Sequence, residues 1–236
     1  MTEVPDTVRE LYPFLYEKRA TAAAEPATDL ADEVARSTRE RVAEITALRR
    51  EVAANCAPRI AACAEQLAER FAAGGRLFAF GNGGSATDAQ GLATTFLHPP
   101  AGPVPDAVPL PALSLTSDAA VVTALSNDVG FDVVFARQLA AFGRRGDIAV
   151  GLSISGGSAN VVQALEEAAR LGMMTVALAG HDGGLLAGLD VLGHLFVIPS
   201  PSVHRIQEAQ TTVYHALWEL TQHALQVVRK ERGGVL

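Results

Sequence analysis

Residues 76–85 read RLFAFGNGGS, and residues 147–158 show a similar pattern as DIAVGLSISGGS. Each stretch begins with a short apolar run and ends in a loop of glycine and serine that opens a helical pattern. Continuous apolar runs of this length are typical of strands that are buried on both faces. Glycines let the backbone turn tightly and approach a ligand closely. The two stretches therefore predict two strand–loop–helix units of an α/β protein.

The two loops also favour a bound anion. Serine hydroxyls and free N–H groups at the start of a helix are hydrogen-bond donors, and the helix dipole favours negative charge there. One such loop is explained equally well as a simple turn, but two loops make phosphate the leading ligand. Neither loop reads G-x-G-x-x-G or ends in Gly-Lys-Ser/Thr, which disfavours dinucleotides and P-loop nucleotides. The candidate phosphate-binding residues are Ser85, Ser153, Ser155 and Ser158.

The order of apolar runs predicts the fold class. Short apolar runs alternate with helical patterns, which indicates a parallel sheet covered on both faces, a three-layer αβα sandwich. Ligands of such sheets bind outside the carboxyl ends of the strands, where the strand order reverses. The expected strands are 76–80, 108–115, 147–152, 174–180 and 194–198, and the helical patterns are about 85–97, 118–125, 131–142, 158–171 and 183–188.

Long helices flank this core. Apolar residues recur at three-, four- and seven-residue intervals over 28–71, where Pro58 is expected to separate two helices or to begin the second. These helices are either an oligomerisation element or a plain covering layer. A closing helix is expected over about 203–229. We divide the chain into an N-terminal arm with oligomerisation helices, 1–71, and an α/β domain, 72–236.

Bulk properties exclude several classes of protein. The net charge of −7 is spread without blocks of like charge, which argues against nucleic acid as a partner. No apolar run approaches the roughly 20 residues of a membrane span, and the acidic first ten residues do not resemble a signal peptide. The expected location is the cytoplasm. Cys56 and Cys63 fit two buried thiols on one helix better than a metal site.

Five stretches carry a family resemblance over about residues 28–230. The chain resembles the sugar isomerase (SIS) domain family and, within it, the bacterial phosphoheptose isomerases. The matching stretches are GNGGSATDAQ at 81–90, SLTSDAAVVTALSNDVGFD at 114–132, GDIAVGLSISGGSANVVQAL at 146–165, VALAGHDGGLLAG at 176–188 and HRIQEAQTTVYH at 204–215.

The resemblance implies a flavodoxin-like fold around a five-stranded parallel sheet, and a homotetramer with N-terminal helices packed between subunits. It implies a sugar phosphate as the ligand. The family's phosphate-binding hydroxyls fall on the same four serines, and its substrate-contacting polar positions fall on Asn82, Asp118 and Gln207.

The chain departs from the family where zinc is bound. In phosphoheptose isomerases a His and, four residues later, a Glu on the helix after GNGGS bind zinc together with a Gln and a His of the last helix. The last two are present as Gln207 and His215, about two helical turns apart. The first two are replaced by Gly91 and Thr95, and threonine neither titrates near neutrality nor binds zinc well. We therefore expect that no cofactor is required, that zinc is disfavoured, and that Gly91 and Thr95 leave polar, water-filled room opposite His215.

Isomerisation of an aldose to a ketose moves a proton between two carbons and needs a base and an acid. His215 is the candidate catalytic residue, and its alternative is a core or interface histidine. His98 shares a helical face with Gly91 and Thr95 and is a possible substitute ligand or base, although Pro99 and Pro100 are expected to end that helix. Asp88 is expected to cap or to form an ion pair, and Glu65 is a possible contribution from a neighbouring subunit.

Two functions fit these observations. The first is an isomerase acting on sedoheptulose 7-phosphate or a related sugar phosphate, without zinc. The second is a non-catalytic sugar-phosphate-binding scaffold or regulator, resembling an SIS protein that binds the bacterial replication initiator and also lacks the catalytic Glu. Retention of Gln207 and His215 favours the enzyme, and the loss at positions 91 and 95 favours the binder. A transcription regulator is disfavoured because the N-terminal helices are acidic.

Overall fold

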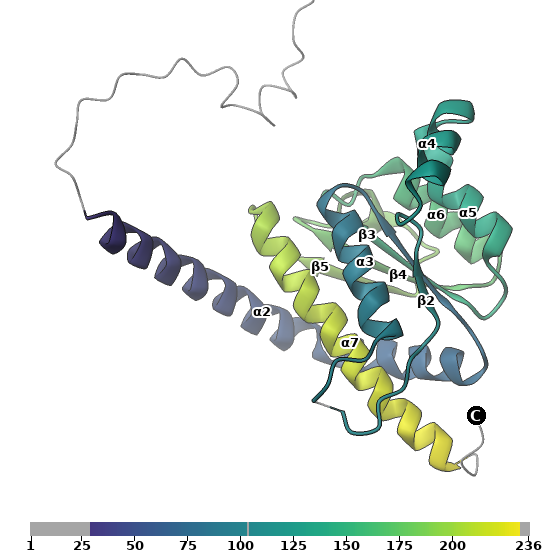
Figure 1. The fold of residues 1–236 in the computed structure, drawn as a ribbon, viewed down its shortest axis with the longest axis horizontal. Helices are drawn as coiled ribbons and strands as arrows, with labels where there is room; N and C mark the ends of the chain where they lie inside the picture. The colour runs from purple at the N-terminus through teal and green to yellow at the C-terminus, as the bar shows by residue number, and fades with distance from the viewer. Residues whose placement is uncertain (1–28, 103, 232–236) are drawn as a thin grey trace, which may run out of the picture. The chain divides into compact units, whose positions relative to one another are not determined.

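A computed structural model describes residues 29–102 and 104–231, of which the side chain of Glu231 is not described. The centre is a five-stranded sheet in which all neighbouring strands run parallel, in the order β2-β1-β3-β4-β5. This arrangement is drawn in Figure 1 and confirms the predicted fold class. The strands are β1 (Leu77–Gly81), β2 (Ala112–Ser114), β3 (Ile148–Ser153), β4 (Met174–Gly180) and β5 (His194–Ile198).

Helices cover both faces of the sheet (Figure 1). One core cluster joins one face of the sheet to the part of α2 from Ile45 onward, to α3 and to α7, and the other joins the opposite face to α5 and α6. Because every residue of β1, β3 and β4 is buried, these strands read as continuous apolar runs. The helices are α2 (Leu30–Ala72), α3 (Gly84–Leu97), α4 (Ala119–Asp128), α5 (Val134–Phe142), α6 (Ala159–Arg170) and α7 (Val203–Glu231).

The long N-terminal helix is not divided. Pro58 lies inside α2, so the expected break at this proline is wrong. Proline has no N–H group, so Pro58 cannot donate a helical hydrogen bond to the carbonyl of Ala54. Both residues are exposed, so water can reach this carbonyl. The chain separates into two compact units between Val42 and Ala43. The expected arm at the N-terminus lies outside the described residues.

Other boundaries shift for local reasons. The strand expected over 108–115 is only three residues long, because Pro109 and Pro111 have no N–H group to donate to a sheet. The pattern over 131–142 begins as a 3₁₀ turn, η2 (Phe131–Val133), before α5, and the last short helical pattern is also a 3₁₀ helix, η3 (Gly184–Gly188). No helix in the described parts of the chain has both the length and the apolar character needed to cross a membrane.

The topology brings the two glycine–serine loops together. β1 and β3 are neighbours, and the chain runs outward from this pair in both directions, so the strand order reverses between them. One loop follows β1 and opens α3, and the other follows β3 and opens α6. Both loops therefore lie at the carboxyl edge of the sheet, at the place where ligands of doubly wound folds bind.

Asp147 ties the opposite edge of the sheet together. Its buried carboxylate accepts hydrogen bonds from the backbone N–H of Arg76 at 2.9 Å and of Arg144 at 3.0 Å. It also pairs with the Arg76 guanidinium at 2.7 Å. The carboxylate thus joins the residue before β1 to the turn before β3.

We expect Asp147→Ala to lower the free energy of unfolding by about 2–4 kcal/mol, because it leaves two backbone donors and one guanidinium without their partner. Chemical denaturation measures this change. Glu40→Ala is the control, since its ion pair with Arg36 is exposed on both sides and contributes little. A loss no larger than that of the control would contradict the assignment.

Candidate phosphate and sugar site

The first loop is tied to the second by a pair of amides. The Asn82 Nδ2 donates to Asn160 Oδ1 at 2.8 Å, and the Asn160 Nδ2 donates back to Asn82 Oδ1 at 3.0 Å. Asn160 lies in the first turn of α6 and is buried. Asn82, predicted to contact substrate, thus links the two loops. Asn160 was not predicted, because nothing in a single sequence shows which asparagines will face each other across two strands.

The second loop leaves the start of α6 open. The Ser153 hydroxyl donates to the Ser158 hydroxyl at 3.0 Å, and Ser155 Oγ accepts from the N–H of Gly157 at 3.2 Å. Ser158 is the N-cap of α6, but its side chain makes no capping hydrogen bond. The N–H of Val161 donates to the Ser158 carbonyl at 3.0 Å, but the N–H groups of Ala159 and Asn160 come before the first helical hydrogen bond of α6 and remain available to an anion.

A glycine is required to shape this loop. Gly156 has φ of 65°, and a Cβ atom there would lie 1.9 Å from the carbonyl oxygen of Gly183. Any side chain at position 156 would therefore force apart the loops that follow β3 and β4. The close approach of these two loops holds the serines in place.

The serines do not all share one surface. Ser153 and Ser158 are bonded to each other, and Ser155 is exposed beside them. Ser85 is buried in the first turn of α3, where its N–H donates to the Asn82 carbonyl at 2.9 Å. Three of the four predicted serines therefore form one loop cluster, and the fourth belongs to the neighbouring loop.

A cavity of about 260 Å³ lies beside the first loop. Its walls include Asn82 and Thr116 as polar groups and the rings of Phe131 and Phe135. This combination of an apolar wall and a few polar groups is common where proteins bind small organic molecules. The cavity has room for a sugar chain next to Asn82.

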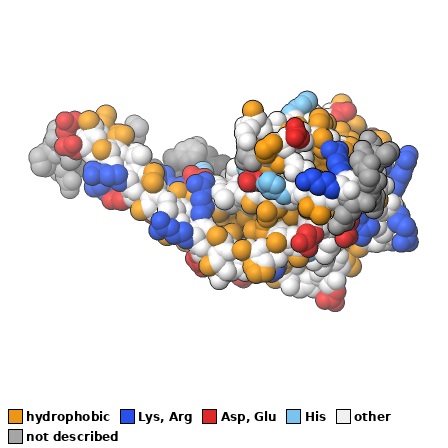
Figure 2. Space-filling model, turned by 90° about the horizontal axis from the view of Figure 1, so that it is seen from below, with side chains coloured by type: hydrophobic (Ala, Val, Ile, Leu, Met, Phe, Trp, Pro, Cys, Tyr) orange, Lys and Arg blue, Asp and Glu red, His pale blue; other side chains and the backbone are white. Residues whose placement is uncertain are grey.

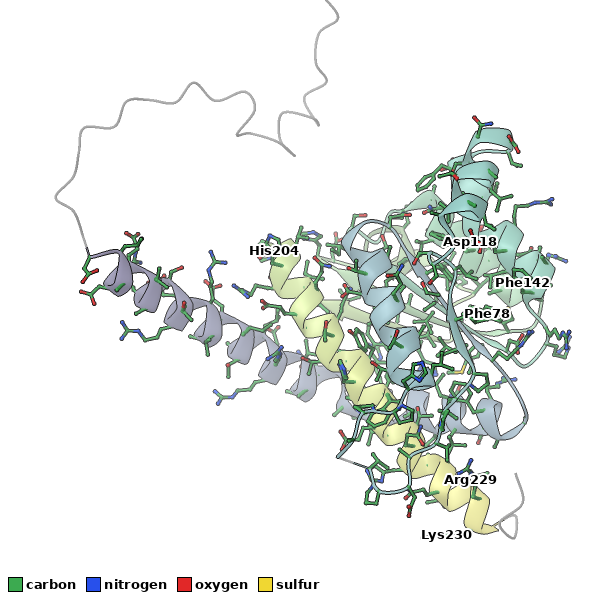
Figure 3. All side chains as sticks on the ribbon, viewed as in Figure 1. Phe78, Asp118, Phe142, His204, Arg229 and Lys230 are labelled. Atoms are coloured by element: carbon green, nitrogen blue, oxygen red, sulfur yellow. The ribbon has the colours of Figure 1, made fainter. Side chains whose placement is uncertain are left out.

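Asp118 lies where α4 begins (Figure 3). Its carboxylate accepts a hydrogen bond from the N–H of Val121 at 3.1 Å, so it caps α4. The side chain is exposed, and the cap leaves its second oxygen atom for another partner. The predicted contact with substrate remains a prediction.

A second polar cluster lies where α3 packs on α7. The Gln207 amide donates to Asp88 Oδ2 at 3.1 Å. A Cβ atom at Gly84 would lie 2.5 Å from the Gln207 Nε2, so the absence of a side chain there lets Gln207 reach α3. Burial raises the pKa of Asp88, and the hydrogen bond from Gln207 partly offsets this shift. Asp88, expected as a cap or an ion-pair residue, is in fact the partner of Gln207.

Tyr214 fills the space where we expected water. A Cβ atom at Gly91 would lie 3.0 Å from the Tyr214 hydroxyl oxygen, and Tyr214 is buried. The Thr95 hydroxyl donates to the carbonyl of Gly91 at 2.9 Å, within its own helix. The expectation of polar, water-filled room at these two positions is therefore wrong. No local pattern indicates this tyrosine, because it comes from α7, far from Gly91 in the chain.

His215 is held in one orientation. Its Nδ1 lies 2.7 Å from the carbonyl oxygen of Thr211, which can only accept, so the neutral imidazole carries its proton on Nδ1. Its ring stacks on Tyr214 with centroids 4.7 Å apart. The side chain is exposed, and its Nε2 keeps a lone pair for a proton or a ligand.

Gln207 and His215, the two candidate residues on α7, make different contacts in the part of the chain that the structure describes. Gln207 points to Asp88 on α3, whereas His215 borders an open surface pocket with Arg49 and Glu219. His98 is exposed just after the end of α3. Glu65 is exposed on α2.

The residues present at positions 91 and 95 do not fit a zinc site. Gly91 has no side chain, and Thr95 uses its hydroxyl within the helix. Among the described residues, no three His, Cys, Asp or Glu side chains are grouped closely enough to hold a metal ion. The donors that remain are an amide and one imidazole, fewer than a catalytic zinc requires.

Comparison with known proteins agrees with this architecture. The model of the SIS domain family matches residues 42–180. The phosphoheptose isomerase of Desulfovibrio desulfuricans is 46% identical over 168 residues, which are 71% of this chain and 74% of that protein. That of Roseiflexus is 43% identical over 169 residues, 72% of this chain and 83% of that protein.

Solved structures show the same relationship. The phosphoheptose isomerase of Neisseria gonorrhoeae superposes with a TM-score of 0.73 at 34% identity, over 80% of this chain and 99% of that chain. That of Francisella tularensis has the same TM-score at 31% identity, over 84% of this chain and all of the other. The chain therefore belongs to the SIS domain family and, within it, to the phosphoheptose isomerase group.

The raised pKa of Asp88 predicts a pH dependence of stability. The fold favours the protonated carboxyl, so the ionised side chain destabilises the protein at neutral pH. Asp88→Asn keeps an acceptor for Gln207 and removes the charge. We expect the variant to melt at a higher temperature than the wild type at about pH 7. The difference should shrink as the pH falls toward the ordinary aspartate pKa of about 3.9. Melting curves with a pH-independent difference would contradict this.

Proposed function

We propose that the protein is a sugar-phosphate aldose–ketose isomerase that acts on sedoheptulose 7-phosphate or a related sugar phosphate. The observation that carries this proposal is the pairing of two glycine–serine loops at the β1/β3 edge, with the N-terminus of α6 open beside Ser155 and Ser158. The names of the relatives support the same reaction. In this proposal the phosphate binds at the loop between β3 and α6, and the sugar chain extends along the cavity beside Asn82.

His215 is the proposed proton-transfer residue. The carbonyl of Thr211 fixes its tautomer, which leaves Nε2 as a base on an exposed ring. Gln207, anchored by Asp88, is the proposed hydrogen-bond partner of the substrate. Because Gly91 and Thr95 supply no ligand, we propose that turnover needs no zinc. Catalysis should then be slower than in family members with the full set of ligands.

A homotetramer is part of the proposal. Hydrophobic side chains gather on the face shown in Figure 2. An apolar groove between α2 and α7 is lined by Val52, Ala53, Ile60 and Val213, among others. Exposed apolar surface is one of the features that mark a contact with another chain, and this supports the proposed assembly. The cytoplasmic location expected from the sequence also remains a prediction.

A non-catalytic binder is the second candidate. It is favoured by the lack of a carboxylate at position 95, where Thr95 is buried and bonded to its own helix. A protein of this class would keep the phosphate loops and the tetramer but would not exchange protons with its ligand. The first experiment below separates the two candidates.

We expect the purified protein to interconvert sedoheptulose 7-phosphate with its aldose isomer, and neither added zinc nor a chelator should change the rate more than about twofold. The reason is that no described residue set replaces the missing ligands. Coupled or NMR-monitored turnover measures this rate. Binding without turnover would support the binder, and activity abolished by the chelator would refute the metal-free proposal.

Replacing Ser155 and Ser158 together by Ala should weaken sugar-phosphate binding by roughly 2–3 kcal/mol, at about 1–1.5 kcal/mol for each hydrogen bond to a charged group. Calorimetric titration measures the loss. Ser37→Ala is the matched control, since its hydroxyl accepts a hydrogen bond from Arg41 Nε at 3.4 Å on the exposed part of α2, far from both loops in the chain. Unchanged affinity in the double variant would place the phosphate elsewhere.

Light scattering should report a tetramer at micromolar concentration. Ala53→Arg should dissociate it, because an unpaired guanidinium would be buried in the groove between α2 and α7. Ala53 is exposed in the single chain, so the substitution should not disturb the fold. Glu166→Arg, on the exposed surface of α6, is the control. A wild-type monomer, or a tetramer that tolerates the arginine at position 53, would contradict this assembly.

A further inference from the structure

Two glycines of α3 face two long polar side chains of α7. Gly84 and Gly91 are seven residues apart, as are Gln207 and Tyr214. A Cβ atom at Gly84 would lie 2.5 Å from the Gln207 amide nitrogen, and one at Gly91 would lie 3.0 Å from the Tyr214 hydroxyl oxygen. Seven residues are about two helical turns, so both contacts fall along one line where the helices pack.

Tyr214 cannot easily leave this position. Its side chain is only 5% exposed, it belongs to the main core cluster, and its ring stacks on the neighbouring His215. Moving the ring would expose apolar surface and break the stacking. A side chain at position 91 would therefore be opposed by a residue that the core holds in place.

Thr95, one turn further along α3, is a second position at which a metal ligand would be costly. Thr95 lies four residues after Gly91 on the same face, is buried, and donates its hydroxyl to the Gly91 carbonyl. A carboxylate in its place would be buried on the helix face that also carries Gly91. The cost of such a charge is large unless a metal or an ion pair compensates it.

We infer that Tyr214 occupies the space that a metal-binding side chain at position 91 would need. Its position therefore prevents a zinc centre from assembling at this site. The loss of ligands on α3 and the tyrosine on α7 are then one coupled change across a helix contact. The consequence of this inference for catalysis rests on the proposed function. The inference itself concerns side-chain packing, so zinc binding and stability can test it without an activity assay.

The test compares zinc binding by four chains: the wild type, Tyr214→Val, the double variant Gly91→His with Thr95→Glu, and the triple variant that combines all three changes. Each is dialysed against zinc, the metal per chain is measured by elemental analysis, and affinity is measured by competition with a chelating dye. We expect no stoichiometric zinc in the first two chains, weak binding in the double variant, and at least tenfold tighter binding in the triple variant.

A matched control separates the tyrosine from a general loosening of α7. The double variant combined with Leu220→Ala changes an exposed apolar residue of the same helix, and it should bind zinc no better than the double variant alone. Stoichiometric zinc in the wild type would overturn the inference. So would equal affinities in the double and triple variants.

A second measurement tests the packing if the triple variant does not fold. Gly91→Ala alone should lower the melting temperature, whereas in a Tyr214→Phe background it should raise it, since alanine is a better helix former than glycine. Equal shifts in both backgrounds would overturn the inference. A wild type that is active and holds one zinc per chain would refute the inference but support the proposed isomerase function. The expected zinc affinities in a protein without turnover would support the inference but refute the isomerase function.

Discussion

The close packing at Gly81 is the constraint on which the rest of the site depends. A Cβ atom there would lie 2.7 Å from the carbonyl oxygen of Leu152, on the neighbouring strand, and 2.8 Å from the Cβ of Ser85, in the first turn of α3. Only glycine lets β1 lie against β3 while the chain turns directly into α3. Both loops, and the line along which α3 meets α7, are positioned by this junction.

The contact between α3 and α7 then decides what chemistry the site has. Gly84 and Gly91 on α3 have no side chains. Gln207 and Tyr214 on α7 therefore occupy the volume that larger residues at these two positions would fill. The result is a cluster of a carboxyl, an amide and a phenol beside an exposed imidazole. Burial raises the pKa of Tyr214, a hydrogen bond with the Thr211 side chain partly offsets this shift, and the charge of the nearby Asp88 adds to it, so the phenol stays neutral. Such a cluster can orient a polar ligand but offers few ligands to a metal.

The two candidate functions, isomerase and binder, make the same use of the two glycine–serine loops as the proposed phosphate site. They differ only in whether the groups on α3 and α7 can move a proton, which depends on one imidazole and on the carboxyl that anchors Gln207. The open lone pair of His215 is the feature that favours catalysis, and the internal hydrogen bond of Thr95 is the feature that favours binding alone. The choice between the functions is thus confined to a few side chains on two helices.

The sequence by itself determined the αβα fold, the five strands and the loops after β1 and β3, because apolar runs and glycine–serine turns are local signals. It also drew attention to Gly91 and Thr95, at which the resemblance predicts metal ligands that this chain does not have. Only the tertiary structure decided that Asn82 pairs with Asn160, that Asp88 holds Gln207, and that Tyr214 covers Gly91. These contacts join residues at least 78 positions apart, and no local pattern carries information about which side chains meet when two helices or two loops pack together.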